Sequence, residues 1–194
     1  MCKVYTKEKS EPLEARLEEF SGKSGITFDN ETNITRICNI LHIANFALPL
    51  DEEGLDGVII IDKDMRAIAI NEKLDVQDAR FVIAHELAHY ITESEKKSDG
   101  ALLFAERDKI FHGKEKRPEE NDMDYLAAAM LVPKNQFLEE LKSLKIDLIS
   151  LADRTESGVR EKISPFIIDF LARRYNVKED VIVRRIAEVS FYVG

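Results

Sequence analysis

The chain has 194 residues, of which 44% are hydrophobic, and its formal net charge is −9 at pH 7. This length and hydrophobic content suit a globular domain with a packed core, and they exclude disorder as the main state. The acidic balance argues against a surface built for nucleic-acid phosphates, and no apolar stretch is long enough to cross a bilayer. Because the first ten residues also lack an apolar signal segment, we expect a cytoplasmic protein. Its two cysteines, Cys2 and Cys38, are then expected to be free thiols.

Two helices are predicted before residue 45. Apolar residues recur at helical spacing near the N-terminus: Leu13, Leu17 and Phe20. This spacing predicts one short helix, beginning near Pro12, in an N-terminal arm over residues 1–26. A second helix is predicted from an N-cap at about Asn30 to about Leu41.

Between residues 45 and 70 the pattern changes from helical to strand-like. Three short runs of mainly apolar residues predict strands over 46–50, 58–61 and 67–70. The last two runs are joined by a polar segment typical of a turn, Asp62-Lys63-Asp64-Met65-Arg66. We therefore predict a small antiparallel sheet.

The sequence His85-Glu86-Leu87-Ala88-His89 is the most informative feature of the chain. It lies in an apolar run over residues 81–91, which predicts a buried helix capped at Asp75 and ending at about Thr92. Residues four apart share a helix face, so the two imidazoles can bind one zinc ion. Glu86 falls beside them, where its carboxylate can take a proton from a water that the metal activates. The pattern is typical of metallopeptidases.

A catalytic zinc site needs a third protein ligand, which the motif does not supply. After a polar loop over residues 93–118, with a helical piece at 102–107, an alanine-rich helix is predicted over 119–131. Glu120 and Asp124 lie one turn apart on a stripe of small side chains, which would allow close packing against the histidine helix. We favour Glu120 as the ligand and Asp124 as the carboxylate that accepts a hydrogen bond from a histidine ring.

Spacing alone leaves other assignments open. An acidic first helical turn also interacts favourably with the helix dipole without binding a metal. Glu119 and Asp122 are competing ligands on other faces of the same helix, and His42 and His112 are imidazoles elsewhere in the chain.

The remainder of the chain is predicted to be helical. Pro133 ends the ligand helix, Ser164-Pro165 begins a helix that ends at Asn176-Val177, and a last helix covers residues 178–189. The predicted fold class is therefore α+β, a small antiparallel sheet with an active-site helix and a ligand helix, followed by C-terminal helices over residues 135–194.

Together these residues resemble the ImmA/IrrE family of zinc-dependent metallo-endopeptidases. The family pattern joins an Arg-Phe pair and A-H-E-[LI]-[GAS]-H to a downstream E-x-x-x-[ND]-x-x-A-A-x-L-L-x-P segment. The matches here are Arg80-Phe81, Ala84–His89 and Glu120–Pro133. Three positions depart from the commoner family residues, and none of them removes a ligand: Leu126, Met130 and Val132.

The resemblance implies a zincin-like fold and a division of the chain into three regions. These are an N-terminal arm over residues 1–26, a zinc metallopeptidase core over 27–134, and a C-terminal helical region packed on the core over 135–194. It also implies a cytoplasmic protease that cleaves a partner, typically a helix-turn-helix repressor, and so regulates transcription of a mobile element or a stress response.

For the site, the resemblance implies Zn²⁺ held by His85, His89 and Glu120, with Glu86 as the general base and Asp124 in the supporting position. Spacing does not assign a donor to the oxyanion that forms during peptide hydrolysis. Three residues are candidates for that donor: Tyr90, His112 and Tyr125.

A rival interpretation is a regulatory or binding protein whose zinc site is not catalytic. It rests on basic residues near the C-terminus that could form a surface for DNA or an acidic partner: Arg173, Arg174, Lys178, Arg184 and Arg185. The acidic chain argues against this surface, so direct nucleic-acid binding is not expected. Three ligands also leave one metal position open, which favours catalysis over a closed structural site.

Overall fold

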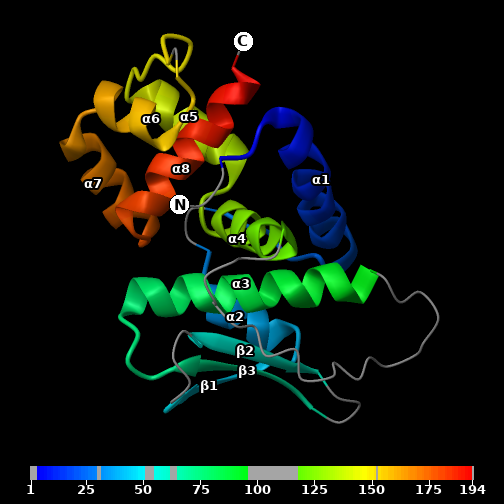
Figure 1. The fold of residues 1–194 in the computed structure, drawn as a ribbon. Helices are drawn as coiled ribbons and strands as arrows, with labels where there is room; N and C mark the ends of the chain where they lie inside the picture. The colour runs from blue at the N-terminus through cyan, green and yellow to red at the C-terminus, as the bar shows by residue number, and fades with distance from the viewer. Residues whose placement is uncertain are drawn as a thin grey trace. The chain divides into compact units, whose positions relative to one another are not determined.

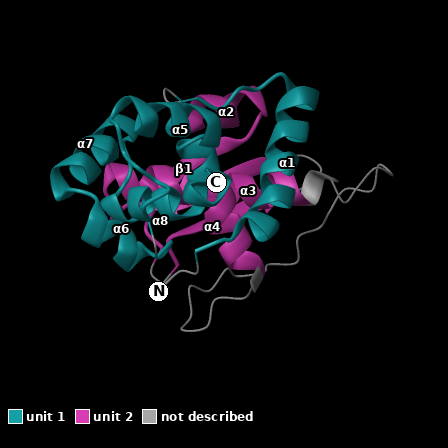
Figure 2. Ribbon diagram, turned by 90° about the horizontal axis from the view of Figure 1, so that it is seen from above, with its two compact units in different colours: residues 1–32, 128–194 teal, residues 33–127 magenta. Residues whose placement is uncertain are grey.

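The computed structural model describes residues 4–29, 32–50, 55–61, 65–95, 118–151 and 153–193. The chain forms two compact units, coloured separately in Figure 2. Unit 1 contains residues 1–32 and 128–194, and unit 2 contains residues 33–127. The division into three regions implied by the family resemblance stays a prediction.

Unit 2 contains a small sheet and the helix that carries the histidine motif. Its elements are α2 (Ile34–Ile40), β1 (Ala44–Leu48), β2 (Gly57–Ile61), β3 (Arg66–Asn71), α3 (Val76–Glu95) and the first part of α4 (Pro118–Leu131). The boundary between the units falls within α4, after Ala127. The predicted helical piece at 102–107 lies outside the described residues.

The sheet has the strand order β1-β3-β2 and is mixed rather than antiparallel. The predicted antiparallel pairing holds for β2 and β3, where Ile59 lies opposite Ile68. It is wrong for β1, which runs parallel to β3 and places Asn45 opposite the same Ile68. Strand β3 lies between β1 and β2 and pairs with both of them. Strands β1 and β2, which are consecutive in the sequence, are therefore not paired with each other. Alternating apolar residues identify strands but do not encode this order of pairing.

The motif helix α3 packs against one face of the sheet through β2 and β3, as Figure 1 shows. It begins as predicted, because the side chain of Asp75 accepts hydrogen bonds from the backbone N–H groups of Gln77 (3.0 Å) and Asp78 (2.9 Å). Helix α2 begins later than predicted. Its N-cap is Asn33, which accepts a hydrogen bond from the N–H of Arg36 at 3.0 Å.

Unit 1 is helical in its described residues. Its elements are α1 (Lys7–Ser24), the end of α4, α5 (Lys134–Ser143), α6 (Glu156–Lys162), α7 (Pro165–Tyr175), α8 (Glu179–Val189) and the 3₁₀ helix η1 (Ser190–Tyr192). Helix α1 is longer than the short helix predicted, since it starts five residues before Pro12. Burial of its apolar face outweighs the one backbone hydrogen bond that proline removes. Helix α8 is buried along most of its length and contacts α6, α7 and η1.

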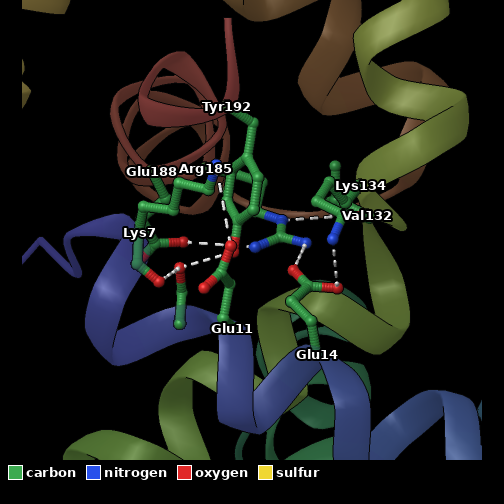
Figure 3. A network of polar contacts seen from close by, with 9 residues as sticks. Lys7, Glu11, Glu14, Val132, Lys134, Arg185, Glu188 and Tyr192 are labelled. Carbon is green, nitrogen blue, oxygen red and sulfur yellow. Dashed lines mark hydrogen bonds and ion pairs between the residues drawn. The ribbon is translucent and has the colours of Figure 1, made fainter.

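The predicted basic surface near the C-terminus is wrong for two of its residues. Arg185 is 0% exposed and donates to Glu14 (2.6 Å) and to the backbone oxygen of Val132 (3.0 Å), as shown in Figure 3. Arg184 is only 7% exposed. Charged residues on a terminal helix normally face solvent, but α8 is enclosed by its neighbours, and an acid on α1 neutralises Arg185 inside unit 1.

Among the described residues, no helix is both long enough and apolar enough to pass through a bilayer.

Candidate metal centre

The structure brings His85, His89 and Glu120 together within unit 2. The Nε2 atoms of the two rings are 3.3 Å apart, and Glu120 Oε2 lies 3.2 Å from His85 Nε2 and 3.6 Å from His89 Nε2. One ligand atom from each of the three residues can be chosen so that all lie within 4.8 Å of one another. Two imidazole nitrogens and a carboxylate oxygen are a donor set that zinc prefers, and three protein ligands leave a coordination position open.

The competing ligands do not join this cluster in the described part of the chain. Glu119 and His42 are exposed, Asp122 is not part of the group, and His112 lies outside the described residues. Glu120 lies one helical turn before Asp124, which is buried and contacts His85, so this side of α4 faces the histidine motif.

Asp124 fixes the orientation of one histidine. Its Oδ1 lies 2.9 Å from His85 Nδ1, and both side chains are buried. If Nδ1 carries the proton and donates to Asp124, the lone pair of Nε2 points to Glu120 and His89, where a metal would bind. Asp124 therefore lies where the helix-face pattern predicts the supporting carboxylate.

The charges in this cluster perturb one another strongly. Hydrogen bonds from His85 and His89 hold the pKa of Glu120 well below its usual range. Burial acts to lower the pKa of His85, but hydrogen bonds to Asp124 and Glu120 and the nearby charge of Glu86 outweigh it and raise that pKa to about 9. The carboxylates of the cluster thus stabilise a positive charge between the ring nitrogens. A bound divalent cation would place its positive charge at the same point.

Glu86 is the buried carboxylate of the cluster. It is 1% exposed, and burial raises the pKa of its carboxyl group. The backbone of Ile59 in β2 hydrogen-bonds to it, whereas its Oε2 has no hydrogen-bond partner among the described residues. A buried acceptor without a partner costs about 1–3 kcal/mol, so this atom is positioned for a ligand rather than for stability.

A glycine at the start of β2 allows the sheet to approach Glu86. A Cβ atom at Gly57 would lie 2.3 Å from Cγ1 of Val82 and 3.3 Å from Oε1 of Glu86. Only a residue without a side chain fits at this distance. The close approach also brings the preceding residue, Asp56, to the rim of the site.

A cavity of about 300 Å³ adjoins the cluster on the side of Glu86. Eight residues line it: Asp56, Leu74, Asp78, Phe81, Val82, His85, Glu86 and Asp124. Asp56 and this cavity were not predicted from the sequence. A glycine next to an acid at the start of a predicted strand was the available signal, because glycine in a strand often marks a close backbone approach.

Two of the three predicted oxyanion donors, Tyr90 and Tyr125, are not at this cavity. Tyr125 is buried in the core, and Tyr90 interacts with the guanidinium of Arg66, which lies 5.8 Å from its ring centre. Neither tyrosine is among the residues lining the cavity, and His112 lies outside the described residues.

Comparison with known proteins places the chain in a family. Residues 38–187 match the family model Peptidase_M78, described as the IrrE N-terminal-like domain, and the chain belongs to this family. This confirms the resemblance predicted from the motifs. No curated protein matches the chain.

The fold is shared with a solved structure, a Mycobacterium tuberculosis transcriptional regulator. The TM-score is 0.52 and the sequence identity is 18%, over 89% of this chain and 46% of that one. The chain thus spans less than half the length of that protein. This likeness confirms the α+β fold class, and the family membership supports a role of the metallopeptidase type.

Proposed function

We propose that the protein is a zinc-dependent endopeptidase. The observation that carries the proposal is a buried carboxylate oxygen without a partner among the described residues, next to two imidazoles and a carboxylate that converge. A structural zinc site would have no use for such a group, whereas peptide hydrolysis needs a base beside the metal.

Each residue of the proposed site has its own role in metal binding or proton transfer. His85, His89 and Glu120 would hold Zn²⁺, and Asp124 would keep the His85 ring in the binding tautomer. When bound, zinc supplies a Lewis acid that polarises the peptide carbonyl. Glu86 would accept the proton of the attacking water and deliver it to the leaving amine nitrogen. The raised pKa of Glu86 suits both transfers, because a carboxyl group that titrates nearer neutrality can accept a proton and give it back.

For the substrate, we propose a helix-turn-helix repressor encoded beside this protein, cleaved in the cytoplasm to release genes of a mobile element or a stress response. The support is the family to which the chain belongs, together with the family resemblance of its motifs.

Metal binding is tested with a matched pair of substitutions on one helix turn. Glu120→Gln should weaken zinc binding by at least about tenfold in calorimetry. Glu119→Gln removes the same charge from the adjacent, exposed residue and should leave zinc binding unchanged. Equal zinc affinity of the two variants would contradict the ligand assignment.

Catalysis is tested with zinc-loaded wild type and Glu86→Gln, incubated with the neighbouring repressor. The variant should bind zinc normally and lose nearly all cleavage, because it keeps the ligands and lacks the base. Cleavage by wild type alone would establish the enzyme class and the substrate together. Cleavage at similar rates by both proteins would refute the role of Glu86.

A further inference from the structure

The cavity beside Glu86 extends along one side of helix α3. Asp78, Val82, His85 and Glu86 follow one another at spacings that keep them on the same side of a helix. Asp78 and Glu86 are eight residues apart, which is about 12 Å along a helix axis. The cavity therefore leads from the reactive carboxylate toward the first turn of α3.

The residues that line the cavity differ in polarity from one part of it to another. Glu86, His85 and Asp124 stand at the reactive end, and Leu74, Phe81 and Val82 supply apolar wall. Two more carboxylates, those of Asp56 and Asp78, also border the cavity, and no lysine or arginine is among the lining residues. Asp78 alone would be an ordinary acid in the first turn of a helix. Asp56 comes from a different element and has no such role.

Two observations favour a ligand site at this cavity. Glu86 borders it, is 1% exposed, and has an oxygen without a hydrogen-bond partner among the described residues. Gly57 leaves the space that allows β2 to approach α3 and to present Asp56. At about 300 Å³ the cavity is at the small end of ligand pockets, which suits one side chain better than a cofactor.

We propose that this cavity binds the side chain of a lysine or arginine in the polypeptide substrate, next to the bond that is cleaved. Its place beside the cleaved bond rests on the proposed endopeptidase function. The apolar wall contacts the methylene stem, and the carboxylates of Asp56 and Asp78 bind the cationic head group. An acidic substrate side chain is repelled by the same carboxylates, and a purely apolar one forms no ion pair with them.

Binding is tested without catalysis, using N-acetyl-arginine amide and its uncharged isostere N-acetyl-citrulline amide as probes. In NMR titrations, wild-type protein should bind the arginine probe about 5-fold more tightly than the citrulline probe. A difference of about 5-fold in affinity is near the upper end of what a partly exposed ion pair contributes. Backbone signals of Asp56 and Phe81 should shift, and the preference should shrink as salt is added.

Substitutions assign the preference to the cavity. Asp56→Asn should reduce it about 2-fold, and the double variant with Asp78→Asn should abolish it. Glu72→Gln removes the same charge from an exposed residue outside the cavity and should leave the preference unchanged. Thermal unfolding of each variant verifies that the fold is retained. Equal binding of the two probes by wild type, or a preference that survives the double substitution, overturns the proposal.

A peptide library separates this proposal from the proposed function. Cleavage by zinc-loaded wild type with lysine or arginine enriched beside the cut bond supports both. Cleavage without that enrichment overturns the cavity assignment and leaves the peptidase intact. Arginine-specific binding in the cavity with no cleavage of any peptide or repressor supports the cavity as a cation site and refutes the peptidase.

Discussion

Gly57→Ala tests whether the close approach of β2 to α3 is required. The added Cβ would lie 2.3 Å from Cγ1 of Val82, whereas two non-bonded carbons prefer about 3.5–4.0 Å. Valine in a helix has one strongly preferred rotamer, so Val82 cannot turn away cheaply. Either β2 moves outward or α3 is strained, and overpacking of this kind costs about 1–3 kcal/mol of unfolding free energy.

The matched control is Gly22→Ala in α1. A Cβ at Gly22 meets nothing within 4 Å, and the residue lies inside a helix, where alanine is more stable than glycine by about 0.5–1 kcal/mol. In urea unfolding, the two alanine substitutions should therefore change the midpoint in opposite directions.

A double-mutant cycle identifies the clash itself. In a Val82→Ala background the methyl group that collides with the new Cβ is absent, so Gly57→Ala should cost at least about 1 kcal/mol less than in wild type. Additive effects of the two substitutions, or a Gly57→Ala protein as stable as wild type, would refute the inferred packing of β2 on α3.

Three further outcomes are expected. Asp124→Asn should weaken zinc binding about 10- to 100-fold, measured by competition with a chelator, because the His85 ring loses the carboxylate that orients it. In a Cys2→Ser variant, Cys38 should react with a thiol reagent only on unfolding, since it is fully buried and burial raises the pKa of its thiol to about 11. Burial also raises the pKa of Glu188 from 4.5 to about 7, so the folded protein holds a proton that the unfolded chain releases between these values. Unfolding free energy should fall as pH rises through that window, and Glu188→Gln should flatten the slope.

The candidate site was largely predictable because its main residues lie on two regular helices. Helical periodicity alone places His85 and His89 on one face, and the same periodicity favours Glu120 without excluding Glu119 or Asp122. Such relations depend only on local geometry. They hold wherever the two helices pack together through those faces.

The features that were not predicted depend on tertiary packing. Nothing local distinguishes a β1 that pairs in parallel from one in a hairpin, because the pairing partner arrives more than twenty residues later. The sequence around Arg185 is typical of a surface residue. In the structure Arg185 pairs with Glu14 of α1, which lies near the opposite end of the sequence. The approach at Gly57, and with it the cavity, likewise requires β2 and α3 to be in contact.

Two buried glutamates, Glu86 and Glu188, show why a perturbed pKa does not by itself identify a functional residue. Burial raises the pKa of both. Glu188 lies 3.5 Å from the guanidinium of Arg185, inside a network that joins helices of unit 1. Burial inside a structural network therefore perturbs the pKa of an acid in the same direction as burial in an active site does. Glu86 differs because it borders a cavity and three convergent metal-type donors.

This difference predicts how stability responds when the acid is removed from the site. Glu86→Gln keeps an oxygen for the backbone of Ile59 and replaces a carboxylate, whose charged form burial disfavours, by a neutral amide. Since the amide does not carry the desolvation cost of a buried charge, the metal-free variant should be more stable than wild type by about 1 kcal/mol in urea unfolding. A structural carboxylate would behave in the opposite way. A Glu86→Gln protein less stable than wild type would show that Glu86 serves the fold, and its proposed role as a base would lose its physical basis.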